Sequence, residues 1–268
     1  IQTHFSGPNT KEYWVIDNHL YGKHDAAAIA FYSKGEVTEG SITLEDVPAR
    51  LADLDKQQVD VQVQFSSLFL NIRCHRPEAE LALTRAWNRW IADRCAASNG
   101  RLRWIFTPSL KNPEATAKDM EWAVKNGAVG VLFRGLEGDR FLDHPFFDPV
   151  YARAQELDLP IHFHTHDCPG GQIASYTMAA EEGVDIVDCA FAPLAGITAQ
   201  PSLNALAEAM RFTDRDTGLN FDDLQDTARY WDEVRKSYAP FETGQLASSA
   251  EVYQHELPGG QSTNLYQQ

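Results

Sequence analysis

Three histidines alternate along one apparent strand, Pro160-Ile161-His162-Phe163-His164-Thr165-His166-Asp167, and a carboxylate closes it. Side chains two residues apart in a strand point to the same face, so the three imidazoles share one face. His162 and His166 would stand about 13 Å apart along a strand that rises roughly 3.3 Å per residue, whereas an adjacent pair can converge on one ion. His164 and His166 are the adjacent pair nearest the end of the strand, so we expect them to be the metal ligands, with hydrogen-bonded core histidines as the alternative.

The length and composition of the chain fit a single barrel. Its 268 residues lie close to the roughly 250 that are typical of a (β/α)8 barrel. Hydrophobic residues make up 43% of the chain and aromatic residues 11%, which is enough for a substantial core. Short apolar strands alternate with amphipathic helices, the order that produces parallel sheets. We therefore expect an α/β fold of the TIM (β/α)8-like type, with residues 1–268 as one domain.

The pattern predicts seven strands and seven helices. The strands are expected at residues 13–19, 60–65, 102–107, 128–134, 160–165, 184–190 and 251–257. The helices are expected at residues 44–57, 78–98, 113–126, 149–157, 173–182, 202–210 and 221–238. Seven strands are one fewer than a closed barrel needs, so the barrel is imperfect or residues 36–43 add a strand. An open edge, with the first and last of these strands as its sides, would favour a homo-oligomer.

The charge of the chain excludes several classes of partner. Lys and Arg total 23 against 38 Asp and Glu, a formal net charge of −15, which argues against a nucleic-acid or anionic-membrane surface. No apolar run reaches the roughly 20 residues of a membrane span. The four cysteines show no C-x-x-C spacing, which indicates reduced thiols. We expect a cytoplasmic enzyme, and any anionic substrate must be held by local cations or a metal ion.

Polar residues at the expected strand ends are the further site candidates, because barrel chemistry lies where strands end. Asp17 and His19 end the first strand and could bind the metal or support its ligands. Asp167 and Asp188 could orient ligand imidazoles through the second ring nitrogen, or simply cap loops. Arg134 could hold a substrate carboxylate with two hydrogen bonds, and a surface ion pair is its alternative.

Several motifs in residues 1–162 carry a family resemblance. They include Trp14-Val-Ile-Asp-Asn-His19, Asn88-Arg-Trp90, Gly100-Arg-Leu-Arg-Trp104 and Gly130-Val-Leu-Phe-Arg-Gly135. Together they resemble the amidohydrolase-related family that includes metal-dependent decarboxylases. The first strand of that family usually ends D-x-H-x-H, and Tyr21 stands here at the second histidine position. The resemblance implies that His164 takes the place of the ligand histidine on the family's fifth strand.

Motifs in residues 163–268 resemble a second family. They include His164-Thr-His-Asp167, Gly183-Val-Asp-Ile-Val-Asp188, Gly196-Ile-Thr-Ala-Gln-Pro-Ser202 and Tyr230-Trp-Asp-Glu-Val-Arg235. This region is very similar to the carboxyltransferase domain of pyruvate carboxylases and biotin-dependent oxaloacetate decarboxylases. The resemblance implies that His164 and His166 bind metal. It also implies that Thr198 matches the threonine that passes a proton between pyruvate and biotin, with a helix-start hydroxyl as the alternative.

The chain therefore resembles a chimera of two barrel families, joined near residues 157–166. The two resemblances imply a metal-dependent lyase of the decarboxylase type that acts on a small carboxylic or 2-oxo acid. Zinc or manganese would bind to His164 and His166, helped by Asp17 or His19, and Thr198 would pass a proton. A metal-dependent hydrolase of the amidohydrolase type is the first alternative. A chimeric barrel scaffold without turnover is the second.

Overall fold

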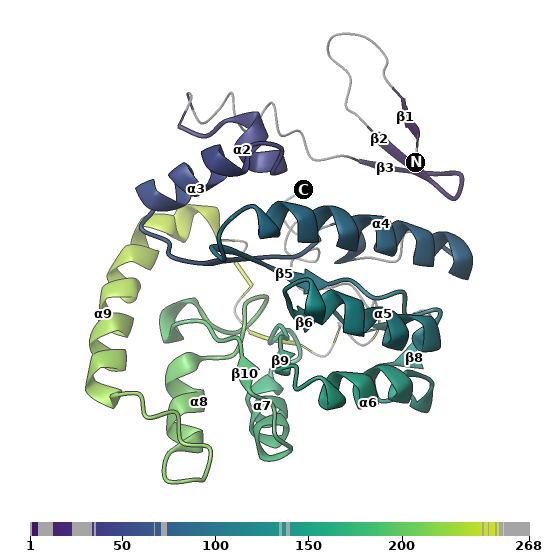
Figure 1. Cartoon of the computed structure of the whole chain (residues 1–268). Helices are drawn as coiled ribbons and strands as arrows, with labels where there is room; N and C mark the ends of the chain where they lie inside the picture. The colour runs from purple at the N-terminus through teal and green to yellow at the C-terminus, as the bar shows by residue number, and fades with distance from the viewer. Residues whose placement is uncertain are drawn as a thin grey trace. The chain divides into compact units, whose positions relative to one another are not determined.

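The computed structural model divides into two compact units, Ile1–Leu159 and Pro160–Gln268. Both units alternate strands with helices, which confirms the α/β class (Figure 1). The structure describes residues 2–4, 13–22, 34, 36–66, 68–70, 74–133, 136–137, 140–242, 244–245, 247–249, 251 and 254. Among these residues, no helix is both long enough and apolar enough to cross a bilayer.

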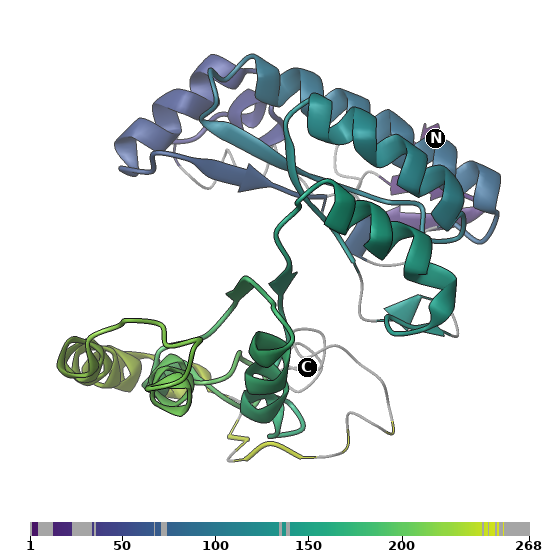
Figure 2. The same ribbon diagram turned by 60° about the horizontal axis from the view of Figure 1, so that its bottom comes forward.

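A parallel three-stranded sheet lies at the centre of the first unit. Its strands, in spatial order, are β4 (Gln62–Gln64), β5 (Leu102–Phe106) and β6 (Ala128–Val131). The larger helices of this unit are α3 (Val47–Lys56), α4 (Pro77–Ala96), α5 (Pro113–Lys125) and α6 (Asp148–Glu156). Helices α4 and α5 lie along the same face of the sheet (Figure 2). Helical crossovers are what parallel strands require.

The core of the first unit lies between β5 and these helices. Leu102, Trp104 and Phe106 alternate with more exposed residues, and all three are buried. They belong to one apolar cluster with Ile91 of α4 and Met120 of α5. The alternation of period two therefore sets which face of β5 meets the helices.

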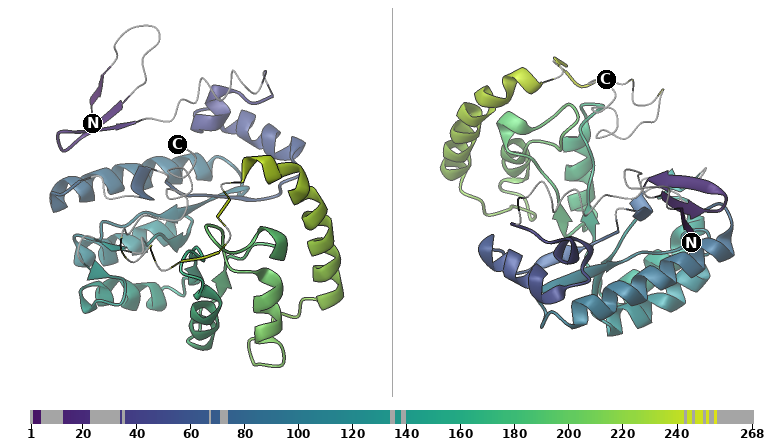
Figure 3. Two further views of the ribbon diagram at one scale, coloured as in Figure 1. Left: turned by 180° about the vertical axis from the view of Figure 1, so that it is seen from behind. Right: turned by 90° about the horizontal axis from the view of Figure 1, so that it is seen from above.

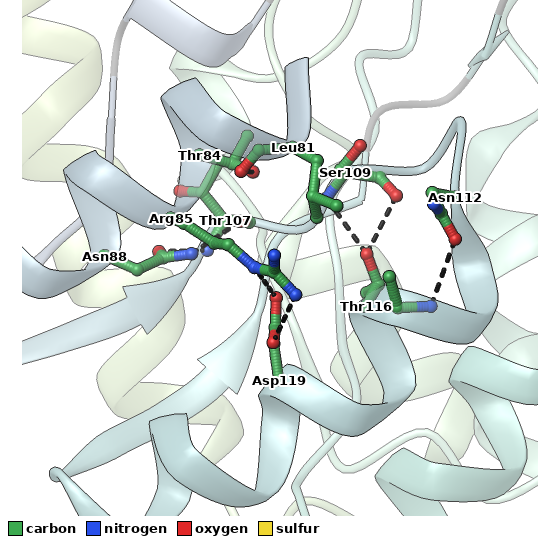
Figure 4. Close-up of polar contacts among 10 residues, drawn as sticks. Leu81, Thr84, Arg85, Asn88, Thr107, Ser109, Asn112, Thr116 and Asp119 are labelled. Atoms are coloured by element: carbon green, nitrogen blue, oxygen red, sulfur yellow. Dashed lines mark hydrogen bonds and ion pairs between the residues drawn. The ribbon is translucent and has the colours of Figure 1, made fainter. Parts of the chain in front are cut away.

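Hydrogen bonds tie the end of β5 to α4 and α5 (Figure 4). Asn88 of α4 donates to the carbonyl of Thr107 at 2.8 Å, and its side-chain oxygen accepts from the Thr107 amide at 2.9 Å. The hydroxyl of Thr116 donates to the Ser109 carbonyl and accepts from the Ser109 amide. These buried side chains supply hydrogen-bond partners for the backbone amides and carbonyls of Thr107 and Ser109, which lie just beyond the end of β5.

The second unit contains a parallel pair of strands and three larger helices. The strands are β9 (His162–Phe163) and β10 (Ile186–Val187). The helices are α7 (Gln172–Glu181), α8 (Leu203–Met210) and α9 (Phe221–Tyr238). Helix α7 packs on α8, and α8 packs on α9 (Figure 3). Tyr176, Leu206 and Met210 form the buried centre of this unit.

Short 3-10 helices complete the two units. They are η1 (Leu68–Leu70), η2 (Pro145–Phe147), η3 (Ala192–Leu194) and η4 (Ala239–Phe241). The helices predicted from sequence are confirmed within about three residues at each end, a common margin for helix boundaries. Asn112 and Asn220 cap α5 and α9, because their side-chain oxygens accept from the amides of Ala115 and Asp223.

The prediction of one strand over residues 13–19 is wrong. Strand β2 (Tyr13–Ile16) ends in a two-residue turn, and the chain returns as β3 (His19–Gly22). Asp17 and Asn18 have φ values of 52° and 64°, the left-handed conformation that tight hairpin turns need. Strand β1 (Gln2–His4) pairs with the other side of β2, so β2 is central in its antiparallel sheet and is not an open edge.

The proposed extra strand at residues 36–43 is also wrong, because residues 39–43 form helix α2 (Glu39–Thr43). The Thr38 hydroxyl accepts from the Ser41 amide and caps this helix.

The expected strand at 251–257 lies outside the described residues, apart from 251 and 254. A short hairpin is formed by β7 (Leu136–Glu137) and β8 (Arg140–Phe141). Among the described strands, parallel pairing is confined to β4-β5-β6 and β9-β10, so a closed eight-stranded ring is not shown.

Candidate functional site

The histidine stretch lies at the carboxyl end of a parallel strand pair. His162 pairs with Ile186 and Phe163 pairs with Val187, so the residues that follow the two strands meet at one edge. His164 follows β9, and Asp188 follows β10. The parallel register therefore brings an imidazole and a carboxylate together.

Asp188 is hydrogen-bonded to two histidines. Its Oδ2 lies 2.7 Å from Nδ1 of His164, and its Oδ1 lies 2.8 Å from Nε2 of His162. Burial alone would raise the pKa of the Asp188 carboxyl, but the hydrogen bonds from His164 and His162 outweigh it and lower the pKa below its ordinary value. An ionised carboxylate accepts from both rings, which places the His164 proton on Nδ1 and the His162 proton on Nε2.

His166 is oriented by a backbone carbonyl. Its Nδ1 lies 2.5 Å from the carbonyl oxygen of Thr198. A carbonyl can only accept, so Nδ1 of His166 carries the proton. The rings of His164 and His166 pack edge to face, with centroids 5.2 Å apart.

The same tautomer suits both rings to metal binding. A ligand histidine normally donates its second ring N–H to a carboxylate or a carbonyl, as His164 and His166 both do. Among the described residues, Nε2 of neither ring has a hydrogen-bond partner, so both lone pairs are available. No group of three or more His, Cys, Asp and Glu side chains in the described part of the chain is arranged to hold an ion. Each of the two rings thus has the tautomer and the available Nε2 of a ligand histidine, and water or substrate would supply the other positions of a metal shell.

Thr198 joins the histidine pair to a cavity. The cavity has a volume of about 380 Å³ and lies between the loop 194–199, helix α9 and residues 241, 242, 244 and 245. Its walls include Ile197, Thr198, Trp231, Arg235, Tyr238 and Phe241. Ile197 has a φ of 56°, which is rare for a β-branched residue. This volume lies within the range of small-molecule sites and the lining is mostly apolar, but Tyr238 and Phe241 are largely exposed, so the cavity is open to solvent.

An ion pair lies at the wall of the cavity. Arg235 Nε donates to Glu242 Oε1 at 2.7 Å, and Arg235 Nη1 donates to the Pro193 carbonyl. The hydrogen bond to Glu242 raises the pKa of Arg235, and the hydrogen bond from Arg235 lowers the pKa of Glu242. Arg235 was not singled out from the sequence, because its place beside Thr198 depends on how α9 packs.

Asp167 contacts backbone groups in the structure. Its Oδ1 accepts from the Gln172 amide at 3.1 Å, at the start of α7. Its own amide donates to the Ala199 carbonyl, and its carbonyl accepts from the Ser248 hydroxyl. Asp167 thus holds the loop after the histidines to the loop that carries Thr198, and a catalytic role for it stays a prediction.

Asp17 and His19 lie in the first unit, in a cluster with residues 74–76, and their role as metal ligands stays a prediction. The Asp17 carboxylate accepts from Arg76 Nε at 2.5 Å, the His75 amide at 3.1 Å and the Cys74 thiol at 3.5 Å. The hydrogen bond from the His75 amide, together with Arg76, lowers the pKa of Asp17 despite the opposing effect of burial. His19 Nδ1 donates to the Asp17 carbonyl at 2.8 Å. Both carboxylate oxygens of Asp17 are therefore already engaged.

Two site residues remain to be placed. Arg134 lies outside the described residues, so its expected role stays a prediction. Tyr176 of α7 was not predicted, although its hydroxyl contacts the backbone of Thr165 between the two candidate ligands. A buried tyrosine on an amphipathic helix gives no sequence signal that would separate it from an ordinary core residue.

Comparisons with known proteins confirm both resemblances. A family model described as amidohydrolase matches residues 74–237, and so extends beyond the expected join. Pyruvate carboxylase of Bacillus subtilis is 43% identical over 154 residues, 57% of this chain and 13% of the relative. Pyruvate carboxylase 1 of Caenorhabditis elegans is 45% identical over 150 residues, 55% of this chain and 11% of the relative. The chain thus spans a small part of these relatives.

A solved structure shows the same similarity. The carboxyl transferase domain of Rhizobium etli pyruvate carboxylase, determined with pyruvate and biocytin, has a TM-score of 0.52 and 34% sequence identity. The match covers 67% of this chain and 31% of that chain.

Proposed function

The chain belongs to the amidohydrolase family, and on that premise we propose that it is a metal-dependent lyase of the decarboxylase type. Its substrate would be a small carboxylic or 2-oxo acid. The observation that carries the proposal is the shared tautomer of His164 and His166, in which Nδ1 of each ring is hydrogen-bonded, to Asp188 and to the Thr198 carbonyl, and Nε2 is left available. Zinc suits such imidazole donors, whereas manganese would rely mainly on oxygen ligands from water or substrate.

The histidine pair would hold the ion, and Asp188 and the Thr198 carbonyl would keep both rings in the ligand tautomer. A divalent ion bound there would polarise a substrate oxygen and stabilise the negative charge that develops as carbon dioxide leaves. Thr198 Oγ1 would pass a proton to the carbon that loses its carboxylate, as the carboxyltransferase resemblance implies. The cavity beside Thr198 would receive the body of the substrate.

Hydrolysis through an activated water is the second candidate. The family match favours it, because the family is described as amidohydrolase. The same two imidazoles would serve both reactions, so the product distinguishes them.

Four free cysteines fit a reducing compartment, and a cytoplasmic location and a homo-oligomer are part of the proposal.

Metal content and product analysis test this proposal. The parent should contain zinc or manganese after purification without chelators, and His164→Ala/His166→Ala should lose it. His144→Ala is the matched control, because His144 lies in the other unit and caps η2. Release of carbon dioxide from 2-oxo acids supports lysis, whereas release of amine from amides supports hydrolysis. Metal content that is equal in parent and double variant would reject the site, and a metal-free parent without turnover would favour a scaffold.

A further inference from the structure

Residues 164–166, which include both candidate ligands, lie beyond the paired part of strand β9. Regular pairing of β9 with β10 ends at Phe163, and the Asp188 amide makes the last contact, to the Phe163 carbonyl. His164, Thr165 and His166 lie beyond this point. Their backbone therefore needs partners other than a neighbouring strand.

A side chain of α7 supplies those partners at Thr165. The Tyr176 hydroxyl accepts from the Thr165 amide at 3.0 Å and donates to the Thr165 carbonyl at 3.4 Å. Its ring packs edge to face on Phe163, with centroids 5.4 Å apart. Tyr176 has no exposed surface, so its position is fixed by the core of the second unit. One buried residue thus contacts the chain on both sides of His164.

The position of Thr165 decides whether both imidazoles reach their partners. His164 must lie within hydrogen-bond distance of Asp188, and His166 within that of the Thr198 carbonyl. These partners stand on two different segments, after β10 and after η3. A backbone shift of about 1 Å at Thr165 would lengthen at least one of these hydrogen bonds beyond its normal range.

We infer that Tyr176 is the positioning residue of this histidine pair, holding the peptide between His164 and His166 so that both rings keep their Nδ1-protonated tautomer. The inference rests on the proposed function for the identity of the ligand. Tyr176 is fully buried, so it would touch neither the ion nor the substrate. It acts through Thr165, in the way that outer residues orient metal-bound histidines.

Tyr176→Phe in the full chain tests the inference, because it removes the hydroxyl and keeps the ring. Co²⁺ serves as the probe, since its visible absorption reports ligand geometry. We expect Co²⁺ to bind roughly 10-fold to 100-fold more weakly, the usual effect of losing an outer-shell contact, with a shifted absorption band. Thr177→Val is the matched control, because it removes a hydroxyl that donates to the Ile173 carbonyl on the same helix. The control should bind Co²⁺ as the parent does.

Nitrogen-15 NMR of the imidazoles in the metal-free protein separates this inference from the proposed function. In the parent and in Thr177→Val, His164 and His166 should show the Nδ1-protonated tautomer, and in Tyr176→Phe at least one ring should show a tautomer mixture. Unchanged imidazole signals would overturn the inference. A parent that takes up no Co²⁺ would contradict the proposed function, while the NMR comparison would still decide the role of Tyr176. If Tyr176→Phe does not fold, 3-fluorotyrosine can be placed at position 176 and at no other tyrosine. This change alters the strength of the hydrogen bonds of the hydroxyl, so the imidazole signals can again be compared with those of the parent.

Discussion

The Asp188 carboxylate lies 2.7 Å from Nδ1 of His164, at the carboxyl ends of two parallel strands. This contact depends on the register of β9 and β10, because His164 directly follows β9 and Asp188 directly follows β10. It turns His164 so that Nε2 is available, and this ring then stands beside that of His166.

Replacement of Asp188 should weaken metal binding. In Asp188→Asn the amide oxygen can still accept, but the amide nitrogen donates, so one of the two histidines loses its acceptor. We expect the affinity for Zn²⁺ to fall by about 10-fold to 100-fold, measured by competition with a chromogenic chelator. Asp185→Asn is the control, because among the described residues the Asp185 carboxylate accepts from the Ile161 amide and from neither histidine. Equal loss in both variants would point to a general effect on the fold.

Asp17 should behave as a structural residue in the first unit. Asp17→Ala removes the acceptor for Arg76 Nε and the His75 amide, so amide exchange at residues 74–76 should become faster. Metal content should stay as in the parent, because both carboxylate oxygens are already engaged. Hydrogen exchange and metal analysis on the same sample check this. Loss of metal without faster exchange would identify Asp17 as a ligand.

Asn88 should contribute more to stability than the ion pair beside it (Figure 4). Asn88→Ala leaves the buried amide and carbonyl of Thr107 without partners, which should lower the free energy of unfolding by roughly 2 kcal/mol or more. Arg85→Ala breaks a partly exposed ion pair with Asp119 and should cost less than about 1 kcal/mol. Urea unfolding of both variants measures the difference. A larger loss in Arg85→Ala would show that this ion pair dominates.

Asp53 should make the stability of the first unit depend on pH. The hydrogen bond from the Ser41 hydroxyl, at 2.5 Å, lowers the pKa of Asp53 from 3.8 against the opposing effect of burial, and Lys56 lowers it further. A carboxyl with a lowered pKa in the folded state stabilises that state above its unfolded pKa, and this contribution is lost as the pH falls through the folded pKa. Asp53→Asn should therefore be less stable than the parent at pH 7, and the difference should shrink below about pH 4. A difference that is the same at pH 7 and pH 3 would contradict this linkage.

The sequence by itself determined the class of the fold and most of the helices. Helix α9 has the predicted bounds, because Asn220 supplies a cap and the apolar period continues to Tyr238. The sequence also determined that His164 and His166 lie close together, since alternation along an extended chain is a local property. The Asp17-Asn18 turn was not predicted, because both residues tolerate the positive φ that they adopt but the pair lacks the glycine of the strongest hairpin signals.

Only the tertiary structure decided which partners the imidazoles have. Asp188, the Thr198 carbonyl and the Tyr176 hydroxyl reach the histidine segment from three different elements. Asp188 was a candidate from its place at a strand end, whereas the other two contacts depend on a loop path and on the packing of α7. Such contacts join residues 11 to 32 positions apart. Local propensity and periodicity do not encode them, because they follow from how helices and strands pack once formed.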